Sequence, residues 1–66
     1  MYQYLSKDEI LRRLTSMEDR EYKYIFERER DIIVKSPEDL KRRAIRLADD
    51  DTYANWEEFW EAVLHG

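Results

Sequence analysis

The chain has 66 residues, of which 42% are apolar, and its 12 Lys and Arg against 16 Asp and Glu give a formal net charge of −4 at pH 7. This composition is enough for one compact core without a deep substrate cavity, so residues 1–66 are predicted to form a single domain. No Cys is present, the one His is next to last, and no apolar run approaches the roughly 18 residues of a membrane span, which predicts a cytoplasmic protein without metal, cofactor or enzymatic activity.

The first predicted helix covers residues 7–15 and begins at a capping box. Ser6 supplies a side-chain oxygen and Glu9, three residues later, supplies a carboxylate, and both can accept from free backbone amides. The positions predicted to face inward are Leu5, Ile10, Leu11 and Leu14. Ser16 is predicted to begin a second segment, because two acids follow it where they favour the positive end of a helix dipole.

Residues 20–35 fit two interpretations. As a helix, the segment presents an apolar stripe formed by Tyr22, Ile25, Phe26, Ile32 and Ile33. As a strand or hairpin, its even positions alternate in polarity, and residues 27–31 would form the turn. That turn contains no Gly, Asn or Pro, which favours the helix, although the β-branched run at 32–34 leaves a short strand as the alternative.

The clearest boundary in the sequence is at residue 36. Ser36 is a typical N-cap, Pro37 suits the first helical position, and acids occupy the first turn. The helix is predicted to run to about Ala48 and to bury Leu40, Ala44, Ile45 and Leu47. Three aspartates then end it, because carboxylates oppose the negative end of the helix dipole, and Thr52 or Asn55 is predicted to cap the last helix.

Together these segments predict an all-α protein, a compact bundle of three or four helices. The alternative fold is α+β, with a short strand or hairpin within residues 21–35. Tyrosines at four positions are predicted to lie at the rim of the core, namely Tyr2, Tyr4, Tyr22 and Tyr24.

The last predicted helix, within residues 52–64, concentrates the candidate functional side chains. At about 100° per residue, one arc holds Trp56, Phe59, Trp60, Val63 and Leu64. Glu57 and Glu61 are four residues apart, so they lie side by side on the surface next to the aromatic edge. An apolar anchor with an acidic flank is typical of docking to a basic surface, whether the tryptophans belong to the core or to the interface. The residues predicted to bind a partner are Glu57, Glu61, Glu58, Trp60, Trp56, Asp50 and Asp51.

Two other candidate sites in the sequence have simpler interpretations. A calcium loop beginning at Asp49 requires Gly and Glu where the chain has Ala54 and Trp60, so a solvated loop is favoured. A basic helix face is formed by Lys41, Arg42, Arg43 and Arg46, and residues 38–64 can be drawn as a helix-turn-helix. Its recognition helix would carry three glutamates that phosphates repel, so no direct nucleic-acid binding is predicted and the cations are assigned to a salt-bridged surface.

The run Asn55-Trp56-Glu57-Glu58-Phe59-Trp60-Glu61, preceded by Tyr53, resembles the central part of the barstar-type ribonuclease inhibitors. This resemblance covers residues 31–64 and implies that Glu57 and Glu61 are nuclease-blocking acids and that Trp60 is the family's helix tryptophan. Residues 56–63 also resemble the YozE family of small SAM-like helical domains. Residues 5–14 are similar to the opening of Hha-type proteins, which are small helical partners of nucleoid proteins.

The predicted function is non-catalytic binding to a basic surface of another protein. The barstar-type resemblance implies inhibition of a nucleic-acid-handling enzyme through the acidic C-terminal helix. The alternatives are a Hha-like regulator that partners nucleoid proteins and a SAM-like oligomerisation or structural module.

Overall fold

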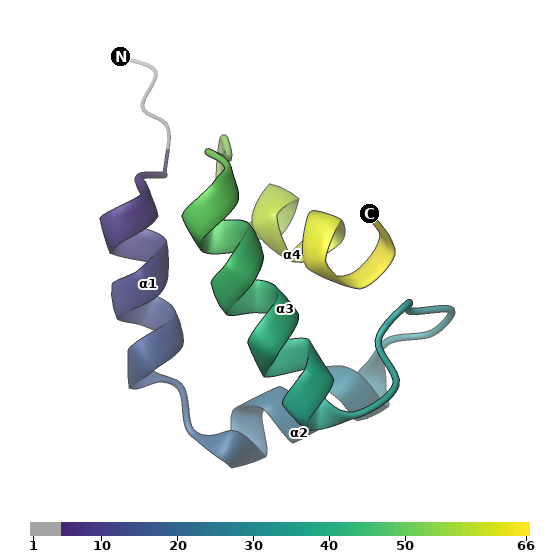
Figure 1. Ribbon diagram of the computed structural model, residues 1–66. Coiled ribbons are helices and arrows are strands. Elements are labelled where there is room, and N and C mark those ends of the chain that lie inside the picture. The colour runs from purple at the N-terminus through teal and green to yellow at the C-terminus, as the bar shows by residue number, and fades with distance from the viewer. Residues whose placement is uncertain (1–4) are drawn as a thin grey trace.

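The computed structural model describes residues 5–66 and contains four helices in that range. They are α1 (Lys7–Ser16), α2 (Asp19–Arg28), α3 (Pro37–Asp50) and α4 (Trp56–His65) (Figure 1). Helix accounts for 71% of the described residues and no strand occurs among them, which confirms the all-α bundle. The α+β alternative is therefore wrong, since the only β-type pairing in this range is an isolated bridge between Leu5 and Tyr53.

Helix α3 is the centre of the bundle and contacts each of the other three helices. In Figure 1 it lies between α1 and α4, while α2 crosses beneath its N-terminal end. Its contact ridge consists of residues spaced by four, Leu40, Ala44 and Ala48, each fully buried. The remaining core side chains come from all parts of the described chain: Ile10, Leu14, Tyr22, Val34, Tyr53, Phe59, Val63 and Leu64.

Helix α1 begins at the predicted cap, where the amide of Glu9 donates to Oγ of Ser6 over 3.1 Å. The predicted second segment does not begin at Ser16, which is the last residue of α1. Glu18 is the N-cap of α2 instead, and its amide donates to Oε2 of Glu21 over 2.6 Å. Glu18 is therefore the N-cap of the second helix, a role that the sequence predicted for Ser16.

The helical interpretation of residues 20–35 is right only as far as Arg28. Beyond it the chain turns through Asp31, which has a positive φ of 55°, and continues without regular structure to the N-cap of α3. Val34 enters the core, and the amide of Ile33 donates to the carbonyl of Leu64 over 3.0 Å. Neither a continued helix nor a strand forms, because this segment is fixed by side-chain burial and by a bond to the end of α4.

The boundaries of α3 agree closely with the sequence. Its first turn is capped by Ser36, whose Oγ accepts from the amide of Asp39 over 3.1 Å, and the helix ends two residues beyond the predicted Ala48. The prediction that Ile45 is buried is wrong, since 43% of the residue is exposed. The ridge that contacts the other helices leaves Ile45 on the outward side, because it follows Ala44 by one residue, about 100° around the helix.

Helix α4 is capped by Asn55, whose Oδ1 accepts from the amide of Glu58 over 2.7 Å, so Thr52 is not the cap. The predicted tyrosine rim is wrong for the two described members of the set. Tyr22 lies in the core at 2% exposure and Tyr24 is 61% exposed, while Tyr2 and Tyr4 lie outside the described residues.

Candidate functional site

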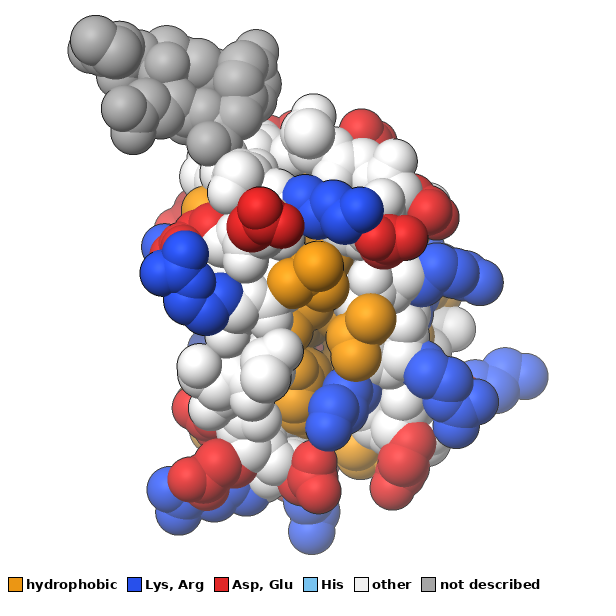
Figure 2. Space-filling view, turned by 60° about the vertical axis from the view of Figure 1, so that its left-hand side comes forward, with side chains coloured by type: hydrophobic (Ala, Val, Ile, Leu, Met, Phe, Trp, Pro, Cys, Tyr) orange, Lys and Arg blue, Asp and Glu red, His pale blue; other side chains and the backbone are white. Residues whose placement is uncertain are grey.

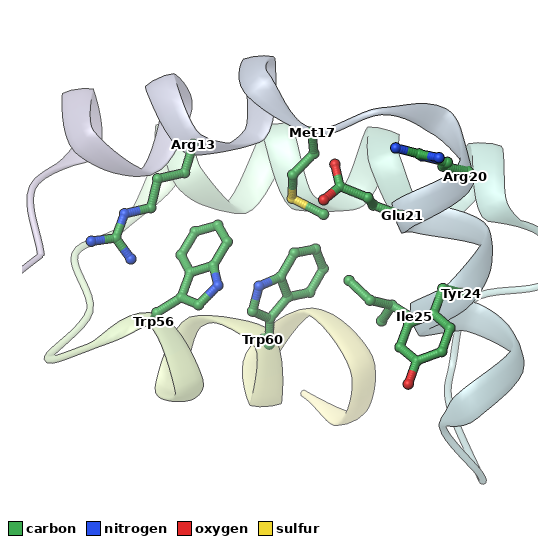
Figure 3. A pocket seen from close by; sticks show the side chains of 8 residues that line it. All are labelled: Arg13, Met17, Arg20, Glu21, Tyr24, Ile25, Trp56 and Trp60. Atoms are coloured by element: carbon green, nitrogen blue, oxygen red, sulfur yellow. The ribbon is translucent and has the colours of Figure 1, made fainter.

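An open groove of about 710 Å³ runs between α4 and the corner formed by α1 and α2. Figure 3 shows Trp56 and Trp60 rising from α4 toward side chains of the other two helices. The groove is lined by Arg13, Met17, Arg20, Glu21, Tyr24, Ile25, Trp56 and Trp60. We call it the tryptophan groove.

The two tryptophans are half-buried because other residues of α4 occupy the positions that face α3. Phe59 and Val63 are fully buried, which leaves Trp56 and Trp60 on the flank of the helix. The ring centroids of Trp56 and Phe59 are stacked 5.4 Å apart, and Trp60 meets both rings edge-on at 5.3 to 5.5 Å. The indoles thus pack against the core on one side and line the groove on the other.

The opposite wall combines a cation with apolar side chains, one of which is a flexible methionine. The guanidinium of Arg13 lies 5.2 Å from the centroid of the Trp56 ring, a distance typical of a cation–π contact. Met17 and Ile25 are half-buried and lie across from the indoles in Figure 3. A methionine adapts its shape to different contacts, so this wall suits a ligand whose apolar side chains vary.

The two arginines that line the groove are neutralised by ion pairs, whereas two glutamates of α4 beside the groove are not. Arg13 pairs with Glu9 at 3.2 Å and Arg20 pairs with Glu18 at 2.7 Å. Glu57 and Glu61 are exposed, line an adjoining hollow of about 450 Å³ together with both tryptophans, and form no ion pair within residues 5–66. The uncompensated charge beside the tryptophan groove is therefore negative.

The other predicted binding residues lie elsewhere. Glu58 lies in the first turn of α4, and its Oε2 accepts a hydrogen bond from the amide of Ala54, before the helix, over 3.2 Å. Asp50 is at the end of α3, and Asp51 Oδ1 accepts from the amide of Thr52 over 2.8 Å. None of these three acids lines the tryptophan groove or the hollow beside it, so the site keeps four of the seven predicted residues: Glu57, Glu61, Trp56 and Trp60.

Lining residues that the sequence did not reveal come from α1, α2 and the link between them. The spacing within each helix marks Met17 and Ile25 only as apolar and Tyr24 as one of several tyrosines. No local pattern indicates that these side chains face α4, because that depends on the angle between α1 and α2. The only indication in the sequence that Ile25 packs against another helix is the apolar stripe of Tyr22, Ile25 and Phe26 in α2.

The aspartates at 49–51 lie at the end of α3, and the side chains of Asp49 and Asp51 make local contacts there. Asp49 pairs with Nζ of Lys7 at 2.6 Å, and this hydrogen bond and the attraction between the charges raise the pKa of Lys7 above its usual value. Among residues 5–66, no group of three or more acidic or His side chains is arranged to hold a metal ion. The tract therefore ends α3 and ties it to the start of α1.

The predicted basic face of α3 is divided among several partners. Lys41 pairs with Asp19 at 3.5 Å and lies 5.6 Å from the centroid of the Tyr22 ring. The half-buried Arg43 turns instead toward the end of α4, where it donates to main-chain carbonyls. The salt-bridged surface that the sequence predicted therefore holds for part of this face.

In the described part of the chain, no helix has the length and apolarity needed to cross a membrane. Comparisons with family models, curated proteins and solved structures find no match to this chain. The features of this chain that indicate a function are therefore the tryptophan groove and the charges that surround it.

Proposed function

We propose that this protein is a small, non-catalytic, cytoplasmic module that binds another protein through the tryptophan groove. The observation that supports this most directly is the pair of half-buried indoles, Trp56 and Trp60, on an open groove beside two carboxylates that have no ion pair within residues 5–66. Tryptophan, tyrosine and methionine are enriched at protein interfaces, and the two aromatic residues supply a large contact area for little loss of conformational entropy.

The partner that fits best is an amphipathic helix with basic residues beside its apolar face. Apolar side chains one helical turn apart would enter the groove and contact Met17, Ile25 and the indoles. Lys or Arg side chains on the flank of that helix would meet Glu57 and Glu61. The chain's net charge of −4 adds a long-range attraction for a basic partner, which raises the rate of association.

The barstar-type resemblance gives this proposal a narrower form, inhibition of a nucleic-acid-handling enzyme. Such enzymes bind the phosphates of nucleic acids with clusters of Lys and Arg. Two carboxylates one helical turn apart can occupy the positions where those phosphates bind. The exposure of Glu57 and Glu61 and their lack of an ion pair within residues 5–66 support this role. An inhibitor of this kind would block its enzyme at a one-to-one ratio.

Affinity capture from the cells that express the protein tests the proposal. The immobilised wild-type chain is compared with the double variant Glu57→Lys and Glu61→Lys, and retained proteins are identified by mass spectrometry. We expect a basic protein that wild type retains and the double variant loses, and that binds wild type directly once purified. Equal retention by both chains would contradict the proposal.

The matched control reverses Asp8 and Glu38 to Lys, which changes the net charge by the same four units. Both carboxylates are exposed, form no ion pair in the described range, and line neither the tryptophan groove nor its adjoining hollow. Each stands in the first turn of a helix, so each reversal costs up to about 1 kcal/mol of stability through the helix dipole. We expect the control variant to retain the same partner protein as wild type in the affinity capture.

A further inference from the structure

A second recessed surface carries the opposite charge. It is a hollow of about 530 Å³ between α3 and the segment that precedes it, lined by Ile33, Val34, Lys35, Asp39, Arg42, Arg43 and Arg46. We call it the basic hollow. Its four cations and one carboxylate give a net charge of +3, so the other residues of a chain with net charge −4 carry −7. It shares no lining residue with the tryptophan groove.

Both walls of the basic hollow are attached to the same end of α4. On the α3 side, Nε of Arg43 donates to the carbonyl of Val63 over 2.8 Å and Nη2 donates to that of Ala62 over 3.2 Å. On the other side, the amide of Ile33 donates to the carbonyl of Leu64 over 3.0 Å. The hollow is therefore arranged before any ligand binds, which reduces the entropy lost on binding.

Most of the positive charge in the basic hollow is free. Lys35 and Arg46 are exposed and form no ion pair within residues 5–66, and the contact of Arg42 with Asp39 is long, at 4.0 Å. Arg42 and Arg46 are one turn apart on α3, where like charges repel each other. An anion seated between them would relieve that repulsion.

We propose that the basic hollow binds an acidic peptide segment of a partner. Its carboxylates would pair with Lys35, Arg42 and Arg46, and an apolar side chain of the segment would cover Ile33, which is 49% exposed. A nucleic acid fits less well, because the chain as a whole carries a net charge of −4, which repels phosphates at long range. An exposed isoleucine beside the cations also favours a peptide over a phosphate backbone.

Fluorescence anisotropy with a labelled peptide of alternating Glu and Leu tests this site. Wild type should bind the peptide saturably and lose affinity with added salt, and the same peptide with Gln for Glu should not bind. The double variant Lys35→Glu and Arg46→Glu should lower the affinity by at least about tenfold. The control Arg12→Glu and Lys23→Glu changes the net charge equally, at exposed positions outside the hollow, and should stay within about threefold of wild type.

Amide chemical-shift mapping on the wild-type chain makes the result independent of how the variants fold. Titration with the Glu–Leu peptide should shift the amides at 33, 35, 42 and 46 more than those of α1. The proposal is overturned if no saturable binding occurs, if both double variants lose affinity equally, or if the shifts map elsewhere. Tighter binding of random duplex DNA than of the peptide would also overturn it.

Discussion

The guanidinium of Arg43 donates a hydrogen bond to the main-chain carbonyl of Val63 over 2.8 Å. The last carbonyls of a helix lack partners within the helix and form the negative end of its dipole, so a cation there stabilises it. A side chain from the central helix thus anchors the helix that carries both tryptophans, Glu57 and Glu61. The same contact gives the basic hollow one of its walls.

Replacing Arg43 with Met should lower the free energy of unfolding by about 1.5 to 3 kcal/mol, because two hydrogen bonds from a charged donor are lost. Urea unfolding followed by tryptophan fluorescence measures the change. Arg42→Met removes an exposed cation from the next position and should stay within about 0.5 kcal/mol of wild type. Equal effects of the two substitutions would show that the Arg43 contact does not hold α4.

Asn55→Ala should destabilise the protein by about 1 kcal/mol, because the amide of Glu58 loses its side-chain acceptor. Thr52 was the other cap candidate in the sequence, and its substitution by Ala should cost less than about 0.5 kcal/mol. Thermal unfolding followed by circular dichroism compares the two variants. If Thr52→Ala lowers the stability more than Asn55→Ala does, the assignment of Asn55 as the N-cap of α4 is wrong.

Replacing aromatic residues of α4 with Ala should distinguish a core residue from a residue of the tryptophan groove by the loss of stability. Phe59→Ala should cost about 3 to 5 kcal/mol, because that ring is fully buried. Trp60→Ala should cost roughly half as much, since one face of its ring already lines the groove. Chemical denaturation measures both values. If Trp60→Ala costs as much as Phe59→Ala, Trp60 belongs wholly to the core and not to the binding surface.

The stability of the fold should fall at alkaline pH. The buried hydroxyl of Tyr22 donates to the carbonyl of Leu14 over 2.8 Å, and burial, with smaller contributions from nearby acids, raises the pKa of Tyr22. A raised pKa in the folded state means that this stability is full below the unfolded pKa of about 10 and is lost as the pH rises through the folded value. The melting temperature should therefore drop above pH 10 or so.

Two phenylalanine variants isolate the contribution of Tyr22. Tyr22→Phe should flatten the alkaline fall, whereas Tyr24→Phe, at an exposed position, should leave it unchanged. The pKa values of Lys7 and Tyr53 are raised too, so part of the fall should persist in both variants. Identical pH profiles for wild type and Tyr22→Phe would contradict this assignment.

The features that the sequence predicted correctly depend on residues close together in the chain. The caps at Ser6, Ser36 and Asn55 each join a side chain to an amide three residues later. Residues 29–35 escaped prediction because their conformation depends on Leu64, about thirty positions away. The sequence did not predict the exposure of Ile45 for a similar reason. Only the packing of α3 against three helices decides which of its apolar residues stay exposed to solvent.

The same limit applies to the candidate site. Helical spacing placed Trp56 and Trp60 on one arc with two acids beside it, and the structure keeps that relationship. Spacing does not give the depth of burial, which depends on how α1 and α2 approach α4. Spacing also did not show that Glu18 is the N-cap of α2 or that its amide donates to the carboxylate of Glu21, so reversing the charge of either residue would disturb the fold.

Figure 2 shows the face on the α1 side of the molecule, where apolar side chains lie in a recess framed by charged groups of both signs. On such a surface, a change in net charge alters binding without any specific contact. Tests of either proposed surface therefore need variants matched in charge.

The most direct test of the tryptophan groove is a fluorescence titration with a basic amphipathic helical peptide of Lys and Leu. Trp56 and Trp60 are the chain's only tryptophans and both line the groove, so their emission reports its occupancy. We expect saturable binding with a blue shift and, for Glu57→Lys with Glu61→Lys, an affinity lower by about thirtyfold, or about 2 kcal/mol. The Asp8→Lys and Glu38→Lys control should bind far more tightly than that variant. No change in emission, or equal weakening in the two charge-matched variants, would contradict a binding role for the groove.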